Sequence, residues 1–120
     1  MDSYDGLENL EIYKMAMEIG EQVWSIVVKW DGFNKYSLGT QLVSAADSIA
    51  NNLSEGYGRY HYKERKQFCY YARGSMFETY TELTKAKARS LIDDVIFNSI
   101  AEQLNILKPK LNAYINSIGK

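Results

Sequence analysis

The chain has 120 residues, the size of one domain, and it contains no internal repeat or linker, so we expect a single domain over residues 1–120. Its fourteen basic and fifteen acidic residues leave a net charge of −1, which excludes attraction to nucleic acid or to an anionic membrane by overall charge. One cysteine excludes an intramolecular disulfide, no apolar run reaches the length of a membrane span, and the acidic N-terminal stretch is unlike a secretory signal, so we expect a cytoplasmic protein with no membrane partner.

The spacing of apolar residues predicts helices and no strands, because steps of three and four recur while proline occurs only once. The first helix is expected over residues 10–30, ending before Asp31 and Gly32. Its apolar face is predicted to contain Leu10, Tyr13, Met17, Gly20, Trp24 and Val27, flanked by Ala16, Val23 and Trp30. Gly20 on this face indicates close approach of a neighbouring helix, because glycine costs about 1 kcal/mol in a helix.

The second helix is expected to begin near Ser37, whose hydroxyl can cap the first turn, and to stop at Gly56. Its apolar face is predicted to contain Leu38, Leu42, Ala45, Ile49 and Leu53. The third helix is expected from Tyr62 to Arg89. Its predicted core face is small and partly polar, and contains Phe68, Ala72, Ser75, Thr79, Leu83 and Ala86.

The fourth helix is expected to begin near Asp93 and to continue past Pro109 with a kink, because the apolar positions stay in phase beyond the proline. Its apolar face is predicted to contain Ile96, Ile100, Leu104, Leu107, Leu111, Tyr114 and Ile118. Short connections between four long helices force neighbouring helices to be antiparallel. The sequence therefore predicts an all-α fold, an up-down-up-down antiparallel four-helix bundle.

No residue pattern predicts a catalytic, cofactor or metal site. Dimetal bundles use paired Glu-x-x-His motifs, whereas the only histidine, His61, has no glutamate three residues before it. Glu78 and Glu82 lie one turn apart and could contact one cation, but such pairs are more typical of a solvated or salt-bridged face. Cys69 is expected to be a small buried residue rather than a nucleophile. We therefore expect no enzymatic activity.

The one local feature that suggests a ligand is the basic, tyrosine-rich stretch at the start of the third helix. Lysine and arginine can neutralise phosphates, and tyrosine can stack on unpaired bases. The candidate nucleic-acid contacts are Arg59, Lys63, Arg65, Lys66, Arg73, Tyr60 and Tyr62. The near-zero net charge favours the alternative, in which this turn is solvated and the many tyrosines pack at a subunit interface.

Polar residues also fall on the second and third helices where they could face each other, namely Asn52, Glu55, Ser75, Glu78 and Thr79. If these helices form a hairpin, Asn52 could join a buried hydrogen-bond network that fixes their register. The alternative is that these residues line a pocket. An enzyme with a carboxylate site at Glu55 and Glu78 is a third hypothesis, although no base, nucleophile or metal motif accompanies it.

Three runs of residues resemble a known family. The run from Ser48 to Gly56 resembles the signature Ser-Ile-Pro-Ser-Asn-Ile-Ala-Glu-Gly of the four-helix bundle proteins encoded in bacterial 23S rRNA intervening sequences. Phe68, Ala72-Arg73-Gly74-Ser75 and Glu78 resemble the family's Phe-x-x-x-Ala-Arg-Gly-Ser-x-x-Glu pattern, and Leu10, Tyr13 and Ala16 resemble its start. The structural signature positions are Asn52, Glu55, Gly56, Phe68, Ala72, Gly74, Ser75 and Glu78, while Ala50, Asn51 and Ser54 depart from the family pattern.

The resemblance implies an up-down four-helix bundle, a homo-oligomer similar to homopentameric rings, and no enzymatic activity. A related branch resembles the accessory variability proteins of diversity-generating retroelements, which bind a reverse transcriptase and RNA through a basic surface. We therefore expect a binding or scaffold module whose partner is a further copy of itself. The alternative is an accessory protein that binds RNA or a nucleic-acid enzyme.

Overall fold

The computed structural model describes residues 4–120. Its elements are η1 (Leu7–Asn9), α1 (Glu11–Val27), α2 (Gly32–Asn34), η2 (Lys35–Gly39), α3 (Thr40–Tyr57), α4 (Tyr62–Ala88) and α5 (Asp94–Ser117). η1 is a 3-10 helix and η2 is a π-helix. The predicted all-α fold with four long helices is confirmed for these residues, and residues 1–3 of the predicted single domain lie outside them.

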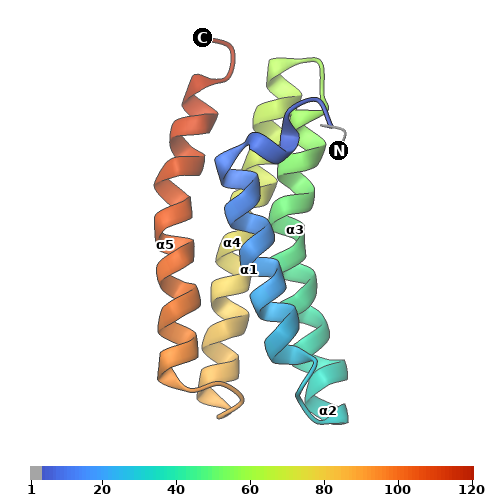
Figure 1. The fold of residues 1–120 in the computed structure, drawn as a ribbon, viewed down its shortest axis with the longest axis vertical. Helices are drawn as coiled ribbons and strands as arrows, with labels where there is room; N and C mark the ends of the chain where they lie inside the picture. Colours follow the sequence, from blue (N-terminus) through green and yellow to red (C-terminus); the bar gives the residue numbers. More distant parts are fainter. Residues whose placement is uncertain (1–3) are drawn as a thin grey trace.

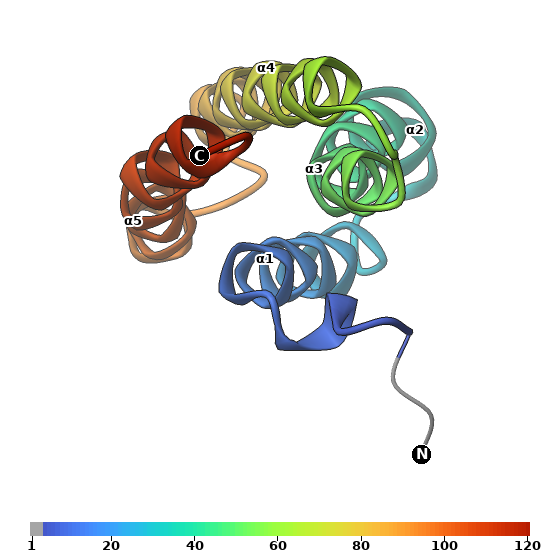
Figure 2. The same ribbon diagram turned by 90° about the horizontal axis from the view of Figure 1, so that it is seen from above.

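The four long helices α1, α3, α4 and α5 form a bundle. Consecutive long helices run in opposite directions along it (Figure 1). Seen from above, they follow one another around a common centre, and α5 completes the circle beside α1 (Figure 2). The most extensive packing is that of α3 on α4. This arrangement leaves four outward-facing seams, each between two neighbouring helices.

The connection from α1 to α3 differs from the prediction. The second helical run is capped by Asp31 and not by Ser37, so that prediction was wrong. The Asp31 carboxylate accepts hydrogen bonds from the Asn34 backbone N–H at 3.2 Å and from the Asn34 side-chain amide at 2.8 Å. Ser37 lies inside the run, where its hydroxyl donates to the Phe33 carbonyl at 2.6 Å. An aspartate that accepts two hydrogen bonds starts the helix earlier, and the run passes into α3 through the π-helical turn η2.

The core faces of α3 and α5 agree with the prediction. The buried residues of α3 and η2 include Leu38, Leu42, Ala45, Ile49 and Leu53. Those of α5 include Ile100, Leu104, Leu107 and Leu111. α5 continues through Pro109, as the phase of its apolar positions predicts. These two helices have one clear apolar face each, and periodicity therefore identifies it.

The core face of α1 is rotated from the predicted one. Met17 and Trp24 are 44% and 56% exposed, whereas Ile12 and Ile19 are buried. The buried face consists of Ile12, Ala16, Ile19, Gly20, Val23 and Val27. The prediction was wrong because α1 carries large apolar residues on two adjoining faces, and periodicity alone does not show which one meets the core. The close approach expected at Gly20 is present, since a Cβ there would lie 2.9 Å from Asp47 Oδ1 on α3.

The core face of α4 is also shifted from the prediction. Ala72, Thr79, Leu83 and Ala86 are buried as expected. Phe68 and Ser75 are only half-buried, whereas their neighbours Cys69 and Met76 are buried. The small residues on this face allow the close packing of α4 on α3.

Gly56 has a packing role rather than the predicted role of ending the second helix. α3 continues through Gly56 to Tyr57, so the predicted end was wrong. A Cβ at position 56 would lie 2.9 Å from Phe68 Cβ and 3.1 Å from the Arg65 carbonyl oxygen. Only glycine therefore allows α3 and α4 to approach this closely.

We predict that Gly56→Ala lowers the free energy of unfolding by about 1–3 kcal/mol, because the added methyl group overlaps the backbone of α4. Gly74→Ala is the matched control, since a Cβ at position 74 meets nothing within 4 Å. Alanine at 74 is expected to stabilise α4 by about 0.5–1 kcal/mol. Chemical denaturation followed by circular dichroism measures both changes, and a neutral or stabilising Gly56→Ala would contradict the packing role.

Candidate functional site

Two of the arginines predicted to contact phosphate instead hold the turn between α3 and α4. Arg59 Nη2 donates to Glu55 Oε2 at 2.8 Å, and the Arg59 guanidinium carbon lies 4.9 Å from the centroid of the Phe68 ring. Arg65 Nε donates to the Arg59 carbonyl oxygen at 2.7 Å. Glu55 and Phe68 are signature positions, and their common partner is Arg59. Both arginines therefore have a structural role in the turn.

The third predicted phosphate-contacting arginine, Arg73, joins α4 to α5. Its Nη1 donates to Asn112 Oδ1 at 2.7 Å. Its guanidinium carbon also lies 5.1 Å from the centroid of the Tyr70 ring. A phosphate at Arg73 would have to compete with these contacts. All three arginines of the predicted nucleic-acid surface thus have partners within the chain.

Of the remaining predicted nucleic-acid contacts, Tyr60, Tyr62 and Lys63 are exposed and Lys66 is half-buried. Lys63 and Lys66 lie in the first turns of α4 and make no ion pair within residues 4–120. Tyr60 and Tyr62 are 87% and 59% exposed. The edge of one of the Tyr60 and His61 rings meets the face of the other, with centroids 5.1 Å apart. Two lysines and two tyrosines therefore make up the unpaired part of this surface.

The polar signature residues do not form the predicted network between the second and third long helices. Asn52 Nδ2 donates to the Ser48 carbonyl at 2.9 Å, within α3. The Ser75 hydroxyl donates to the Tyr71 carbonyl at 3.1 Å, and the Thr79 hydroxyl donates to the Ser75 carbonyl at 2.7 Å, both within α4. Each side chain is satisfied by a carbonyl one turn back in its own helix, so it needs no partner across the interface. The register of α3 on α4 depends instead on the contact at Gly56.

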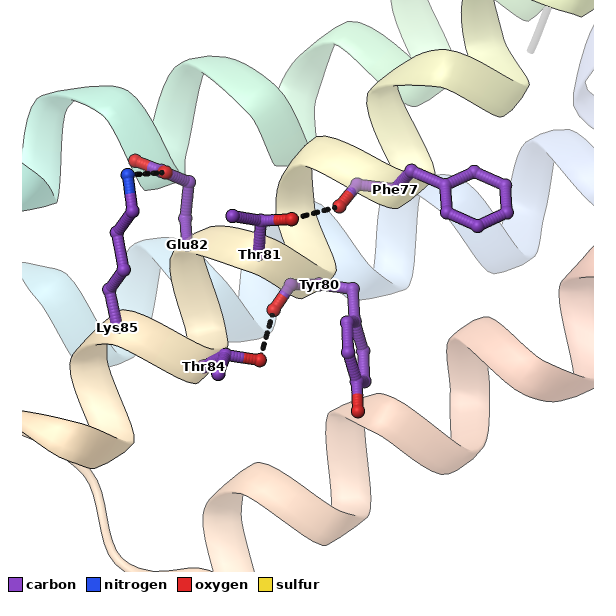
Figure 3. Close-up of polar contacts among 6 residues, drawn as sticks. All are labelled: Phe77, Tyr80, Thr81, Glu82, Thr84 and Lys85. Atoms are coloured by element: carbon purple, nitrogen blue, oxygen red, sulfur yellow. Dashed lines mark hydrogen bonds and ion pairs between the residues drawn. The ribbon is translucent and has the colours of Figure 1, made fainter.

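The two acids one turn apart on α4 have different environments. Glu78 is exposed, whereas Glu82 is only 4% exposed. Glu82 Oε1 lies 3.0 Å from Lys85 Nζ, and both side chains lie on the side of α4 that faces α3 (Figure 3). Glu82 Oε2 is buried without a hydrogen-bond partner in the described part of the chain. The salt-bridged face expected for this pair is thus present at Glu82, but its burial was not predicted.

The described residues show no arrangement typical of a catalytic or metal centre. Cys69 is buried, and burial raises the pKa of its thiol to about 11, so the thiol is neutral at physiological pH. Within residues 4–120, no group of three or more histidine, cysteine, aspartate or glutamate side chains is placed to hold a metal ion. Over the same residues, no helix combines the length and the apolar character that crossing a membrane requires.

Three aromatic side chains of α4 are exposed beside α5. These residues, Tyr70, Phe77 and Tyr80, are 42%, 58% and 47% exposed, and we call them the aromatic ridge. Tyr80 extends toward α5, where its ring centroid lies 5.7 Å from that of Phe97 (Figure 3). Lys108 Nζ on α5 lies 5.4 Å from the Phe77 ring centroid and makes no ion pair with any described residue. The ridge is therefore apolar with an unpaired positive charge beside it.

A second exposed apolar surface lies on the seam between α1 and α3. This α1–α3 groove has a volume of about 500 Å³ and is lined by Trp24, Val27, Val28, Tyr36, Gly39 and Val43, together with Lys35, Thr40 and Ser44. Trp24 and Tyr36 are 56% and 78% exposed. Gly39 allows η2 to approach α1, since a Cβ there would lie 2.7 Å from Val27 Cγ1. No sequence pattern predicts this groove, and the surplus of aromatic residues is only an indirect sign of it.

Two carboxylates lie next to the groove on the same seam. Glu21, one turn before Trp24, and Asp47, one turn after Val43, line a small hollow of about 230 Å³. Partial burial, and secondly the charge of Glu21, raise the pKa of Asp47 above its ordinary value. Neither carboxylate has a basic partner among the residues described. The α1–α3 seam is thus apolar at one end and acidic further along.

Residues 8–113 match the model of the protein family described as 23S rRNA-intervening sequence protein. The match contains all the signature positions from Asn52 to Glu78 and all four long helices except the end of α5. No curated protein matches the chain.

We predict that Lys85→Ala lowers the free energy of unfolding by about 1–3 kcal/mol, because it leaves the buried Glu82 carboxylate without its partner. Lys110→Ala is the matched control. The Lys85 and Lys110 side chains are 44% and 43% exposed, but the partner of Lys110, Glu11, is 68% exposed against 5% for the Glu82 side chain. Lys110→Ala is therefore expected to change stability by less than about 0.5 kcal/mol.

Replacing Glu82 by leucine in the Lys85→Ala background should recover the lost stability, because no buried charge then remains. Thermal and urea unfolding of the four proteins measures these differences. Equal losses for Lys85→Ala and Lys110→Ala would show that burial of Glu82 is not important for stability.

Proposed function

The chain belongs to the 23S rRNA-intervening sequence protein family, and we propose that it is a non-enzymatic, homo-oligomeric four-helix bundle that acts as a binding or scaffold module. Its first partner is a further copy of itself, and the family resemblance suggests a homopentamer. The observation that carries this proposal is the amount of aromatic surface that lies outside the core.

The core is complete without the exposed aromatic residues. A continuous cluster of buried side chains runs through all four long helices, and Tyr70, Phe77 and Tyr80 are not among the residues packed against it. Single exposed apolar residues are common on monomers, but adjoining ones on one seam are typical of interaction sites. The aromatic ridge and the α1–α3 groove are two such surfaces. Tyrosine, phenylalanine and tryptophan are also the residues enriched in subunit interfaces.

Two of the three candidate catalytic side chains are ion-paired or buried, and the third is exposed to solvent. Glu55, one member of the hypothetical carboxylate site, is ion-paired with Arg59. Glu78, the other member, is exposed, and the Cys69 thiol is buried. The proposal therefore assigns no catalytic role to these residues, and gives Asn52, Gly56, Ala72 and Ser75 structural roles in α3 and α4.

We predict that the purified chain forms a discrete oligomer at micromolar concentration, because two apolar surfaces of this kind favour association over exposure to water. Size-exclusion chromatography with light scattering is expected to give a mass that is a whole multiple of 13.8 kDa. Nuclease-treated samples serve as the control, so that bridging by nucleic acid is not mistaken for assembly. A monomer under these conditions would refute the proposal.

The second candidate function is RNA binding at the start of α4. The observation that favours it is the group of unpaired lysines Lys63 and Lys66 with the exposed Tyr60 and Tyr62. Lysines can neutralise phosphates there, and the positive end of the α4 dipole lies at the same place. The surface is smaller than predicted, because Arg59, Arg65 and Arg73 have partners within the chain.

If this second function holds, log affinity for single-stranded RNA falls with log salt concentration. Replacing Lys63 and Lys66 by alanine should then weaken binding and reduce the slope by roughly 1–2. Replacing Lys14 and Lys29, which lie on and just after α1, is the matched control with the same change of charge. Fluorescence anisotropy measures both. Absence of binding at low salt, or equal loss in both variants, would exclude a specific RNA site at the start of α4.

A further inference from the structure

We propose that the aromatic ridge of one copy docks into the α1–α3 groove of a second copy, so that two different faces of the bundle meet. This inference rests on the proposed homo-oligomeric function and names the surfaces that would make the contact. It follows from four properties of the two surfaces: their chemistry, their charges, their heights along the bundle and their positions around it.

The two surfaces are complementary in apolar character. On the ridge, Phe77 is the most exposed ring at 58%, and Phe77 and Tyr80 line a hollow of about 190 Å³ against α5. The groove offers a volume of about 500 Å³ with Trp24 and Tyr36 exposed along it. Burying aromatic rings in such a groove removes apolar surface from water on both copies, and aromatic pairs prefer contact with each other.

The charges of the two sides are opposite. α1 and α3 together carry the acids Glu11, Glu18, Glu21, Asp47 and Glu55 against one base, Lys14, and Lys35 of η2 adds one more base at the groove itself. α4 carries six bases and three acids, and α5 carries two of each, which makes eight bases against five acids. The chain is nearly neutral because these two halves cancel. Opposite potentials on two faces favour association of those faces over like with like.

Charged side chains without an ion-pair partner in residues 4–120 lie beside both the aromatic ridge and the α1–α3 groove. Lys108 lies next to Phe77 of the ridge, and Glu21 and Asp47 lie next to the groove. None of these three has an ion-pair partner within the described chain. A lysine from the second copy would relieve the repulsion between Glu21 and Asp47.

Contacts between α1 and its neighbours fix the height of the groove. Gly39 of η2 lies against Val27, and Gly20 lies against Asp47 on α3. Because α1 and α3 are antiparallel, Trp24 is level with the part of α3 midway between Gly39 and Asp47. Moving along the seam from there toward Gly20 leads to the carboxylates.

The contact at Gly56 fixes the height of the ridge. Gly56 lies against Phe68 and the Arg65 backbone at one end of the α3–α4 pair. Both helices rise by the same distance per residue, so residues equally far from this contact along α3 and α4 lie at the same height in the bundle. Tyr80 is therefore level with Leu42, and so with the groove. Phe77 and its neighbour Lys108 lie one turn further toward Gly56, at the height of the carboxylates. Side-by-side copies with parallel axes would thus meet apolar to apolar and lysine to carboxylate.

The positions of the two surfaces determine the kind of assembly. In the view from above, the α1–α3 seam and the α4–α5 seam lie on opposite sides of the bundle (Figure 2). A contact between different faces leaves one unused ridge and one unused groove on every pair of copies. Such a contact continues until a ring closes or a filament grows, and it does not stop at a two-fold dimer.

The test uses two variants that each remove one face. Trp24→Glu places a charge in the groove, and Phe77→Glu places a charge on the ridge. Each is expected to be a 13.8 kDa monomer by light scattering. Mixed in equal amounts, the two variants are expected to form a dimer of twice that mass, because the intact ridge of one meets the intact groove of the other. Tyr71→Glu is the control on α4, since Tyr71 is 50% exposed but lies outside the ridge, and it should assemble like the original chain.

The outcomes separate this inference from the proposed function. A monomeric original chain would overturn both. An original chain that assembles, with variants that still assemble or that stay monomeric on mixing, would overturn only the docking of ridge into groove. If two identical faces met in a two-fold dimer, only one of the two variants would lose assembly, and mixing the variants would not restore it.

Charge exchange provides a second test in case a glutamate variant fails to fold. Lys108→Glu and Glu21→Lys are exposed or partly exposed changes, and each is expected to raise the dissociation constant of the assembly by about tenfold or more. A chain carrying both changes should regain the original affinity, because the exchanged charges meet across the contact. No loss in the single variants, or no recovery in the double variant, would overturn the proposed docking.

Discussion

The contact of α3 with α4 at Gly56 is the constraint on which much of the structure depends. With no side chain at this position, α3 lies directly on Phe68 and on the backbone of α4 at Arg65. The chain must then reverse within a short turn, and Arg59 stabilises that turn by contacting both Glu55 and Phe68. Three signature positions, Glu55, Gly56 and Phe68, thus serve one purpose, the close pairing of two antiparallel helices.

This pairing decides how the residues of α4 are divided between the core and the surface. The side of α4 that meets α3 is made of small residues and of the polar Thr79 and Glu82, which are tolerated because Thr79 bonds within its own helix and Glu82 contacts Lys85. Phe68 meets α3 at Gly56, whereas Tyr70, Phe77 and Tyr80 lie on the side of α4 toward α5 and solvent. Close packing on one side of α4 thus occurs together with exposed aromatic rings on another side of the same helix.

The sequence predicts the buried face of a helix correctly where that helix has a single apolar face. The apolar faces of α3 and α5 were predicted because they alternate clearly with polar residues, and Pro109 was placed inside α5 because the phase continues past it. The prediction failed on α1, because Trp24 and Met17 are apolar but face outward. Packing against other helices decides which large aromatic residues of a helix are exposed, and the periodicity of that helix does not show this packing.

The candidate site shows the same limit. The arginines of the basic stretch, and Glu55 four residues before Arg59, could be identified from the sequence. The partners of Arg65 and Arg73, which are the Arg59 carbonyl and Asn112, are set by the fold. Glu78 and Glu82 look alike in sequence, yet the structure buries Glu82 and leaves Glu78 exposed. Spacing along one helix predicts neighbours on that helix, whereas contacts between helices depend on rotation and register that no local pattern fixes.

A net charge near zero does not show how the charges are distributed among the helices. An even mixture of charges would give weak fields on every side, whereas here α1 and α3 carry five acids against one base, and α4 and α5 carry eight bases against five acids. A polyanion would be attracted to one side and repelled by the other, and the arginines nearest to it already have partners. A second copy in the parallel, side-by-side orientation would bring its Lys108 to the height of Glu21 and Asp47. The separation of charge between the two sides therefore favours self-association over nucleic-acid binding as the use of the surface that the core leaves exposed.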